Sequence, residues 1–338
     1  MITDAIRLLV DKHNLSTEMM EDVFQYIMDG KASDVQIGSF LTALTMKGET
    51  IDEISAAAKV LRDKSERIQS DKELIDIVGT GGDMANTFNI STVSAIITAA
   101  SGAYVSKHGN RSASSNCGSA DVLEALGVNL NASPEHSEKM LNEVGLCFMY
   151  APVYHSSMKY VSNARKEIKI RTIFNILGPL SNPAKASRML LGVFDKALVR
   201  PLAEVLSNLG IKRAMVVHGF DHLDEITLTD KTYVSEVRDH QVIDYVFDPL
   251  KYGFTYTDPA KIQGGDKTFN KHIILSILEG EKSPKRDISI LNSGVSIYLY
   301  NDDITLNEAF DRARASIDSK KALNKLNELI EVSHAYDS

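Results

Sequence analysis

The sequence predicts an α/β protein: a small N-terminal helical bundle domain joined to a larger α/β domain with a mainly parallel central sheet. Two observations support this prediction. The first 68 residues show helical spacing of apolar side chains between helix start and stop signals, and from about residue 70 short apolar runs alternate with helical stretches. Such alternation is typical of βαβ units, which bind ligands at the carboxyl ends of their strands. We therefore expect a helical domain at 1–68, with a returning segment near 160–185, and an α/β domain at 69–338.

Composition limits the class of protein. With 338 residues, 43% of them hydrophobic and 24% charged, the chain is long enough for two ordinary globular domains. Its net charge of −8 argues against nonspecific nucleic-acid binding, which needs a basic surface. Because it shows no long apolar run and no signal-peptide pattern, we expect a cytoplasmic protein without a membrane segment. Cys117 and Cys147 form no CxxC pair, in keeping with a reducing compartment.

Helix signals are explicit in the first 67 residues. Ser33–Gln36 and Thr50–Glu53 are capping boxes, and Lys47-Gly48 supplies a helix end between them. Apolar residues recur there at intervals of three and four, as they do on the inward face of a helix. They include Leu8, Leu9, Val23, Ile27, Phe40, Leu41, Leu44, Ile54, Ala57 and Leu61. We predict a bundle of four helices.

Short apolar runs then mark the strands of the sheet. Strands are expected at residues 75–78, 103–106, 146–149 and 214–217. Helices between them are expected at residues 93–100, 120–126 and 201–209. Farther along we expect a hairpin at 226–237, a helix at 269–278 and an amphipathic C-terminal region that begins at the capping box Thr305–Glu308.

A glycine-rich turn, within Asp76-Ile-Val-Gly-Thr-Gly-Gly-Asp83, follows the first strand, and Ser91 and Thr92 open the next helix. Glycines let backbone N–H groups approach a ligand closely, and a helix N-terminus adds donors and a positive dipole. The turn suits a phosphate or diphosphate, although a βα turn without a ligand is the alternative. Asp83 would repel a bare phosphate, which indicates a sugar hydroxyl or a metal partner.

The second strand leads into a polar loop, Lys107-His-Gly-Asn-Arg-Ser-Ala-Ser-Ser-Asn-Cys-Gly-Ser119. Lys107 and Arg111 bring positive charge to it, and its serines and asparagine bring hydrogen-bond donors. Two polar loops at neighbouring strand ends can hold a polyanion from both sides. A solvated basic loop is the alternative.

A third cluster precedes Arg165. On one continuous helix the same side would carry Tyr154, Met158, Val161 and Arg165. Arg165 would then present its planar guanidinium beside an apolar surface, an arrangement that suits an aromatic or apolar acid. Spacing alone favours the alternative, an ion pair between Arg165 and Glu167.

The fourth cluster, Val217-His-Gly-Phe-Asp-His-Leu-Asp-Glu-Ile226, follows a strand. Its adjacent carboxylates Asp224 and Glu225 would repel each other unless they are exposed or share a cation, and oxygen ligands select Mg²⁺ or Mn²⁺ over zinc. His218 and His222 permit a zinc alternative, but the sequence offers neither a nearby cysteine nor an HExxH pattern.

Together these motifs resemble those of the anthranilate phosphoribosyltransferase family over nearly the whole chain. In chain order the matching stretches are Gly79-Thr-Gly-Gly-Asp83, Asn89-Ile-Ser-Thr92, Lys107-His-Gly-Asn-Arg111, Gly118 to Gly127, Arg171-Thr-Ile-Phe-Asn175, Leu177-Gly-Pro179 and Asp224-Glu225. The resemblance implies that the phosphoribosyl group of 5-phosphoribosyl 1-diphosphate is transferred to the amine of anthranilate, in the second step of tryptophan biosynthesis from chorismate. It also implies a nucleoside phosphorylase-like fold and a homodimer formed through the helical part.

The resemblance also implies a set of site residues. Contacts to phosphoribosyl diphosphate would come from Gly79, Gly82, Asp83, Thr87, Asn89, Ile90, Ser91, Thr92, Lys107, His108, Gly109, Asn110, Arg111, Ser112, Ala113, Ser114, Ser115 and Ser119. Two Mg²⁺ ions per subunit would be held by Ser91, Asp224 and Glu225, and anthranilate would be faced by Gly79, Asn110 and Arg165. The nucleophile is a neutral arylamine that should need little general-base help, so no acid or base residue is assigned.

One stretch departs from the family pattern. Where the family usually has His-His-Pro-Ala-Met, this chain has Tyr154-His-Ser-Ser-Met158, and we expect Tyr154 to alter how the aromatic acid is held. Two rivals share the fold. A pyrimidine nucleoside phosphorylase usually has a lysine-containing loop before the glycines, which is absent here, and a non-catalytic nucleic-acid-binding relative should be basic.

Overall fold

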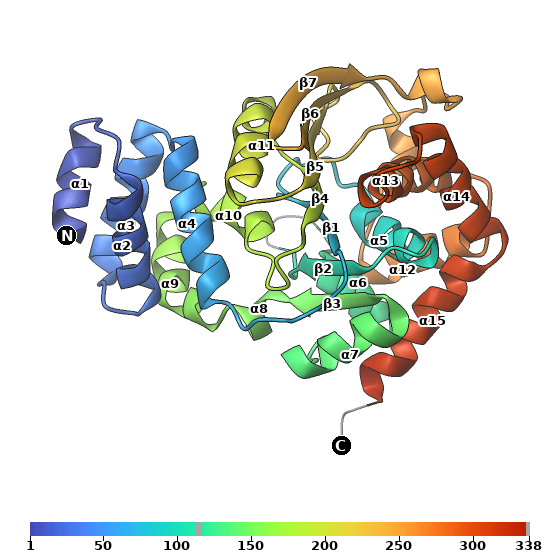
Figure 1. Cartoon of the computed structure of the whole chain (residues 1–338), viewed down its shortest axis with the longest axis horizontal. Coiled ribbons are helices and arrows are strands. Elements are labelled where there is room, and N and C mark those ends of the chain that lie inside the picture. Colours follow the sequence, from blue (N-terminus) through green and yellow to red (C-terminus); the bar gives the residue numbers. More distant parts are fainter. Residues whose placement is uncertain (113–115, 336–338) are drawn as a thin grey trace.

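The computed structural model describes residues 1–112 and 116–335. Four helices open the chain and confirm the predicted bundle: α1 (Ile2–Val10), α2 (Thr17–Met28), α3 (Asp34–Lys47) and α4 (Ile51–Lys64). Both capping boxes form, since Ser33 Oγ accepts the Gln36 N–H at 3.3 Å and Thr50 Oγ1 accepts the Glu53 N–H at 3.2 Å. The bundle lies at one side of the molecule (Figure 1).

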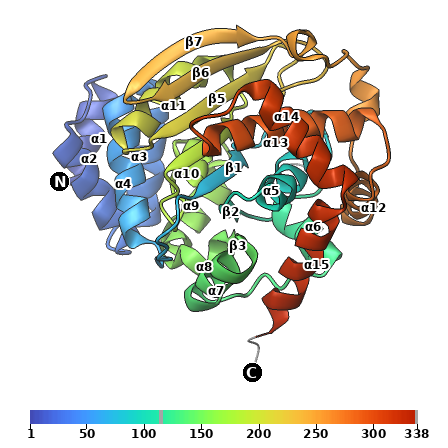
Figure 2. The same ribbon diagram turned by 45° about the vertical axis from the view of Figure 1, so that its right-hand side comes forward.

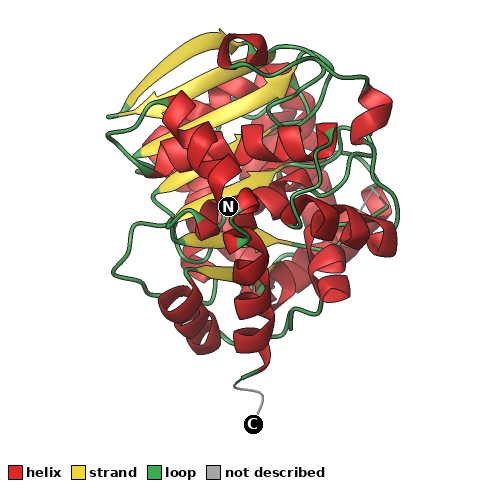
Figure 3. Cartoon of the chain, turned by 90° about the vertical axis from the view of Figure 1, so that its right-hand side faces the viewer, coloured by secondary structure: helices red, strands yellow, loops and turns green. Residues whose placement is uncertain are grey.

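Seven strands form one sheet in the order β3-β2-β1-β4-β5-β6-β7 (Figure 3). Their bounds are β1 (Ile75–Gly79), β2 (Val105–Gly109), β3 (Leu146–Tyr150), β4 (Arg188–Gly192), β5 (Arg213–Gly219), β6 (Thr232–Arg238) and β7 (Gln241–Phe247). The first five strands are parallel, and β6 and β7 add an antiparallel hairpin at one edge. The fold class is confirmed.

Two strand predictions need correction. The hairpin expected at 226–237 lies farther along, because its turn is Asp239-His240, where both residues have a positive φ. Strand β4 was not expected, since its five residues are all buried and show no alternation of polar and apolar side chains.

Helices cover both faces of the sheet. They are α5 (Ile90–Ala100), α6 (Ser119–Leu126), α7 (Pro134–Val144), α8 (Ala151–Tyr154), α9 (Lys159–Ile168), α10 (Phe174–Leu180), α11 (Val199–Asn208), α12 (Lys267–Leu278), α13 (Pro284–Tyr300), α14 (Leu306–Asp318) and α15 (Lys321–His334). Among residues 1–112 and 116–335, none of these helices is long and apolar enough to cross a membrane.

Alternating side chains divide the core into two clusters, one on each face of the sheet. On β4, Leu190 packs into the cluster with α5 and α13, whereas Met189 and Leu191 pack into the cluster with α11 and the N-terminal bundle. This period of two is what a strand buried on both faces requires. The α13–α15 side comes forward in Figure 2.

The chain returns to the N-terminal bundle after β3. Helix α9 contacts α2 and α3, helix α10 contacts α4, and Val161 and Leu177 lie in the same core cluster as the bundle helices. The segment from α9 to α10 therefore approaches the sheet from the side of the bundle.

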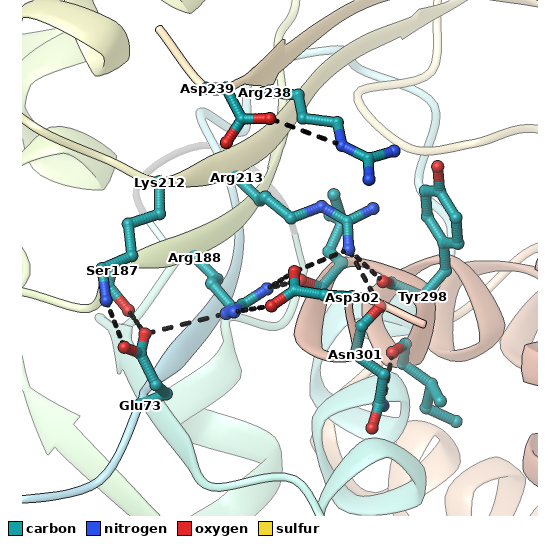
Figure 4. A network of polar contacts seen from close by, with 12 residues as sticks. Glu73, Ser187, Arg188, Lys212, Arg213, Arg238, Asp239, Tyr298, Asn301 and Asp302 are labelled. Carbon is teal, nitrogen blue, oxygen red and sulfur yellow. Dashed lines mark hydrogen bonds and ion pairs between the residues drawn. The ribbon is translucent and has the colours of Figure 1, made fainter. Parts of the chain in front are cut away.

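Two buried arginines tie the opposite, amino-terminal edge of the sheet to the end of α13 (Figure 4). Arg188 on β4 binds Asp302 through both terminal nitrogens at 2.8 and 2.9 Å. Arg213 on β5 donates to the Tyr298 and Asn301 carbonyls at 3.0 and 2.9 Å. Cations at a helix C-terminus satisfy its last carbonyl groups. This network braces the sheet at the edge away from the predicted loops.

Candidate active site

A cavity of about 970 Å³ opens at the carboxyl ends of the parallel strands. The predicted site residues that line it are Gly79, Gly82, Asp83, Thr87, Asn89, Ile90, Ser91, Lys107, His108, Gly109, Asn110, Arg111, Ser112, Ser119, Arg165, Asp224 and Glu225. Thr92 is not among the lining residues, and its hydroxyl is buried without a hydrogen-bond partner in the described part of the chain. Ala113, Ser114 and Ser115 lie outside the described residues.

The glycine turn leads from β1 toward α5. Gly82 has φ +81°, a conformation that side chains rarely adopt, as the glycine pattern predicted. Helix α5 begins at Ile90, and its N-cap residue, Asn89, makes no side-chain capping bond. The Asn89 amide donates instead to the Cys117 carbonyl at 2.9 Å. The Ile90 and Thr92 N–H groups donate to the Phe88 and Asn89 carbonyls at 2.7 and 3.1 Å, so the start of α5 offers the cavity its positive dipole and the Ser91 hydroxyl.

Strands β1 and β2 separate directly below this turn. They pair only at Ile75 and Val105, and side chains fill the gap beyond. Buried Asp76 accepts the His108 N–H at 3.2 Å and the Asn182 side-chain N–H at 2.7 Å. Lys107 Nζ donates to the Ile77 carbonyl at 2.6 Å, and burial lowers its pKa.

Lys107 belongs to β2, not to the loop in which the sequence pattern placed it. Its ammonium reaches the Ser91 hydroxyl at 3.2 Å, at the start of α5. A cation is thus fixed between the glycine turn and the second polar loop, where a polyanion was expected.

The positive charge of Arg111 is already paired within the protein. Its guanidinium binds Asp121 at 2.9 Å and Glu124 at 2.7 Å. Arg111 still lines the cavity, so its contribution to ligand binding stays a prediction. The sequence gives no direct sign of this pairing, since both carboxylates come from α6.

Three carboxylates gather on the wall of the cavity formed by the ends of β1 and β5. Asp224 accepts the Gly81 N–H at 2.7 Å, and its own N–H points to Asp83 at 3.5 Å. Burial, with the charge of Asp83, raises the pKa of Asp224 to about 7. Burial and the charge of Asp224 also raise the pKa of Glu225, while Lys107 opposes that rise.

The acidic loop lies close against β4. A Cβ atom on Gly192 would come within 1.6 Å of the Asp224 carbonyl oxygen, so only glycine permits this approach. Asp221 holds the loop from below, because its carboxylate accepts the Thr227 hydroxyl at 2.6 Å. The carboxylates are therefore held at the cavity wall by the fold around them.

The donor set fits magnesium that arrives with a phosphorylated ligand. Ser91, Asp224 and Glu225 offer only oxygen atoms, which are the ligands of Mg²⁺ and not those preferred by zinc. Mg²⁺ is usually held by one or two carboxylates plus substrate phosphates. Residues 1–112 and 116–335 contain no group of three or more His, Cys, Asp or Glu side chains that could hold a metal ion.

Arg165 stands on α9 on the other side of the cavity. Its guanidinium lies 5.1 Å from the centre of the Phe174 ring, and burial lowers its pKa. The ion pair with Glu167 suggested by spacing does not form among the described residues, although helical pairs such as Arg200–Glu204 do. A half-buried cation beside an aromatic ring remains available for an anionic ligand.

The continuous helix expected through Tyr154 and Arg165 is wrong. Helix α8 ends at Tyr154, His155 has non-helical angles of φ −120° and ψ 62°, and α9 begins only at Lys159. Tyr154 is buried, and its hydroxyl lies 2.6 Å from that of Ser137 on α7. It does not line the cavity, so an effect of Tyr154 on the bound acid would have to act through its neighbours and stays a prediction.

His155, the next residue, faces the cavity instead. Its ring lies 5.0 Å from that of His108, and burial lowers the pKa values of His108 and His155 to about 3 and about 4. Both rings are therefore neutral near pH 7. They form an aromatic surface that the sequence analysis assigned only in part.

Two more lining residues, Arg171 and Phe194, were not among the predicted site residues. Arg171 is the first residue of Arg171-Thr-Ile-Phe-Asn175, a stretch that resembles the family, and this resemblance could have identified it as a site residue. Phe194 follows β4, the strand that the sequence analysis missed.

Comparisons with known proteins identify the family of the chain. Residues 3–65 match the glycosyl transferase family, helical bundle domain, and residues 71–323 match the glycosyl transferase family, a/b domain. The anthranilate phosphoribosyltransferase of Endomicrobium trichonymphae is 53% identical over 99% of each chain. The crystal structure of the anthranilate phosphoribosyltransferase from Thermus thermophilus has a TM-score of 0.93 to this structure at 37% identity, and the match covers 98% of this chain and 100% of that one.

A third relative, the anthranilate phosphoribosyltransferase from Saccharomyces cerevisiae in complex with PRPP and Mg, has a TM-score of 0.89 at 27% identity, with 98% of this chain and 97% of that one covered. The first two relatives span essentially the whole of this chain at well over the identity that marks a common family. The chain belongs to the anthranilate phosphoribosyltransferase family.

Proposed function

We propose that this protein transfers the phosphoribosyl group of 5-phosphoribosyl 1-diphosphate to the amine of anthranilate, giving N-(5-phosphoribosyl)anthranilate and pyrophosphate in the second step of tryptophan biosynthesis. The observation that carries the proposal is that two kinds of charged side chain line one cavity. Asp224 and Glu225 stand at the strand ends beside the glycine turn, and Arg165, which has no ion pair among the described residues, stands beside Phe174 on α9. We call these two parts of the lining the diphosphate half and the acid half.

The diphosphate half of the cavity would act by electrostatics. Breaking the ribose C1–O bond leaves an oxocarbenium-like centre and a pyrophosphate that carries the negative charge. Ser91, Asp224 and Glu225 would hold Mg²⁺, two ions per subunit in this proposal, and the metal would supply positive charge for that leaving group. The positive end of the α5 dipole and the Lys107 ammonium, which is fixed on the Ile77 carbonyl, add positive charge held in place before the reaction.

The acid half of the cavity would act by positioning. Arg165 binds the anthranilate carboxylate, and the neutral rings of His108 and His155 offer the aromatic acid a surface without competing charge. The amine is then directed at C1 of the ribose. Because both reactants are already bound and aligned, the reaction does not have to meet the entropy cost of bringing them together. The neutral arylamine attacks through its nitrogen lone pair, and after the C–N bond has formed the nitrogen loses one proton to solvent or to the departing pyrophosphate. No described side chain is therefore assigned as a base.

We also infer the domain division, the oligomeric state and the location of the protein from the sequence and the family. The division into a helical domain at 1–68, with a returning segment near 160–185, and an α/β domain at 69–338 is supported by the contacts of α9 and α10 with the bundle. A homodimer formed through the helical part, in the cytoplasm, completes the proposal. Sedimentation analysis of the purified protein tests the dimer.

The reaction itself is tested by fluorescence. Purified protein mixed with anthranilate, phosphoribosyl diphosphate and Mg²⁺ should remove the anthranilate fluorescence, because the amine becomes substituted. A chelator should stop the loss, and excess Mg²⁺ should restore it. Fluorescence loss that persists in the chelator, or that needs only one of the two substrates, would contradict the proposal.

Replacing Tyr154 by phenylalanine should lower stability without changing substrate binding. The substitution removes the hydroxyl that lies 2.6 Å from Ser137 Oγ, at a cost of about 1 kcal/mol for a buried hydrogen bond. Because Tyr154 does not line the cavity, the KM for anthranilate should stay at the wild-type value. Thermal denaturation and steady-state kinetics check both parts, and a changed KM with an unchanged melting temperature would restore the role expected from the sequence.

A further inference from the structure

Arg171 reaches across the cavity to the glycine turn. It stands between α9 and α10, on the segment that approaches from the bundle, and its Nη2 donates to the Gly82 carbonyl at 2.7 Å. The turn that follows it is closed by the Asn175 side chain, which accepts the Thr172 N–H at 2.9 Å. Arg171 is thus an exposed residue whose backbone is followed by a closed turn and whose guanidinium is held by a hydrogen bond.

The guanidinium of Arg171 stacks on an aromatic ring. The central carbon of the Arg171 guanidinium lies 4.0 Å from the centre of the Phe194 ring. Phe194 is itself joined to the glycine turn, since its N–H donates to Thr80 Oγ1 at 3.0 Å. Stacking on a ring and donation to a carbonyl hold an arginine in one orientation.

The charge of Arg171 has no acidic partner among the described residues. Its contacts are a neutral carbonyl and a ring, whereas Arg111 on the facing loop binds Asp121 and Glu124. A guanidinium has five N–H donors, and the Gly82 carbonyl takes one of them. The remaining donors lie at the mouth of the glycine turn, in a residue that lines the cavity.

We propose that Arg171 binds the substrate's diphosphate at the glycine turn. This assignment rests on the proposed function and adds a binding residue to it. A planar guanidinium matches two phosphate oxygens at once. Its contact with Gly82 places it on the diphosphate half of the cavity, whereas Arg165 stands beside Phe174 on the acid half.

Binding without turnover tests the assignment. Calorimetric titration of each protein with phosphoribosyl diphosphate and Mg²⁺, in the absence of anthranilate, measures the affinity directly. Arg171→Gln should weaken binding about tenfold or more, the usual scale for losing hydrogen bonds to a charged group. Arg171→Lys keeps the charge and loses the planar fork, so its loss should be smaller.

Steady-state kinetics distinguish a direct contact between Arg171 and the diphosphate from a purely structural role of Arg171. Arg171→Gln should raise the KM for phosphoribosyl diphosphate and leave the KM for anthranilate at the wild-type value. Lys166→Gln is the matched control, because Lys166 is exposed on the same segment and does not line the cavity. It should behave as wild type in both measurements.

The two measurements can contradict the assignment of Arg171 separately from the proposed function. Wild-type affinity in the Arg171→Gln variant, or an equal loss for both substrates, overturns the assignment and leaves the proposed function in place. A wild-type protein that binds no phosphoribosyl diphosphate overturns the proposed function and the assignment together.

Discussion

Replacing Asp224 and Glu225 together by alanine should abolish turnover in a protein that still folds. Both carboxylates face the cavity, and burial raises their pKa values, that of Asp224 to about 7. A raised pKa in the folded protein means that the charged form is costly there, so removing the two charges should not reduce stability near neutral pH. What is lost is the oxygen donors for Mg²⁺. We expect kcat to fall about a thousandfold or more, the upper range seen when preorganised electrostatic groups are removed.

The matched control removes two carboxylates that have no part in the cavity. Asp303 and Glu331 are exposed and do not line it, so the double variant Asp303→Ala, Glu331→Ala changes the net charge equally. It should keep wild-type kinetics. Circular dichroism establishes that both double variants are folded, and titration with Mg²⁺ follows activity. Near-normal turnover in the folded Asp224→Ala, Glu225→Ala variant would remove these residues from the metal site.

Much of this site could be predicted because its residues follow strand ends. The carboxyl ends of β1, β2 and β5 meet at one edge of the sheet, so loops far apart in the sequence converge there. The helical bundle was also predictable, because capping boxes such as Thr50–Glu53 are local signals that the structure uses directly.

The errors arose where tertiary contacts decide. Tyr154 and Arg165 have helical spacing, but the chain leaves the helix at His155, so that the tyrosine packs against α7 and not beside the ligand. Arg111 stands in a polar loop, and the loop sequence does not indicate that two carboxylates of α6 pair with its guanidinium. Spacing along one segment carries no information about what another segment will place against it.

Strand β4 shows the same limit for the fold. Its five residues, Arg188–Gly192, are buried on both faces, so they show no alternation of polar and apolar residues. Missing this strand also hid Phe194, which lies just beyond it, and Gly192, which must be glycine because the acidic loop crosses it.

Replacing Arg165 by alanine should raise the KM for anthranilate about tenfold to a hundredfold, the range expected for a lost hydrogen bond to a charged group. The expected effect is electrostatic, because Arg165 is a cation without an anionic partner in the described part of the chain. The guanidinium is half-buried beside Phe174, burial lowers its pKa, and no carboxylate of the described residues pairs with it. A carboxylate from the ligand would supply the missing partner. The KM for phosphoribosyl diphosphate should change little, since Arg165 is not among the groups that surround the glycine turn.

Two variants and one acceptor analogue make this test specific. Arg165→Lys keeps the charge and should lose less affinity than Arg165→Ala, while Lys166→Ala, one residue along the same helix, should behave as wild type. Aniline lacks the carboxylate, so the wild-type protein and the Arg165→Ala variant should use it equally poorly. Equal increases in the KM values of both substrates would show that Arg165 supports the cavity as a whole. An Arg165→Ala variant that still prefers anthranilate to aniline as strongly as the wild type would assign the carboxylate to another residue.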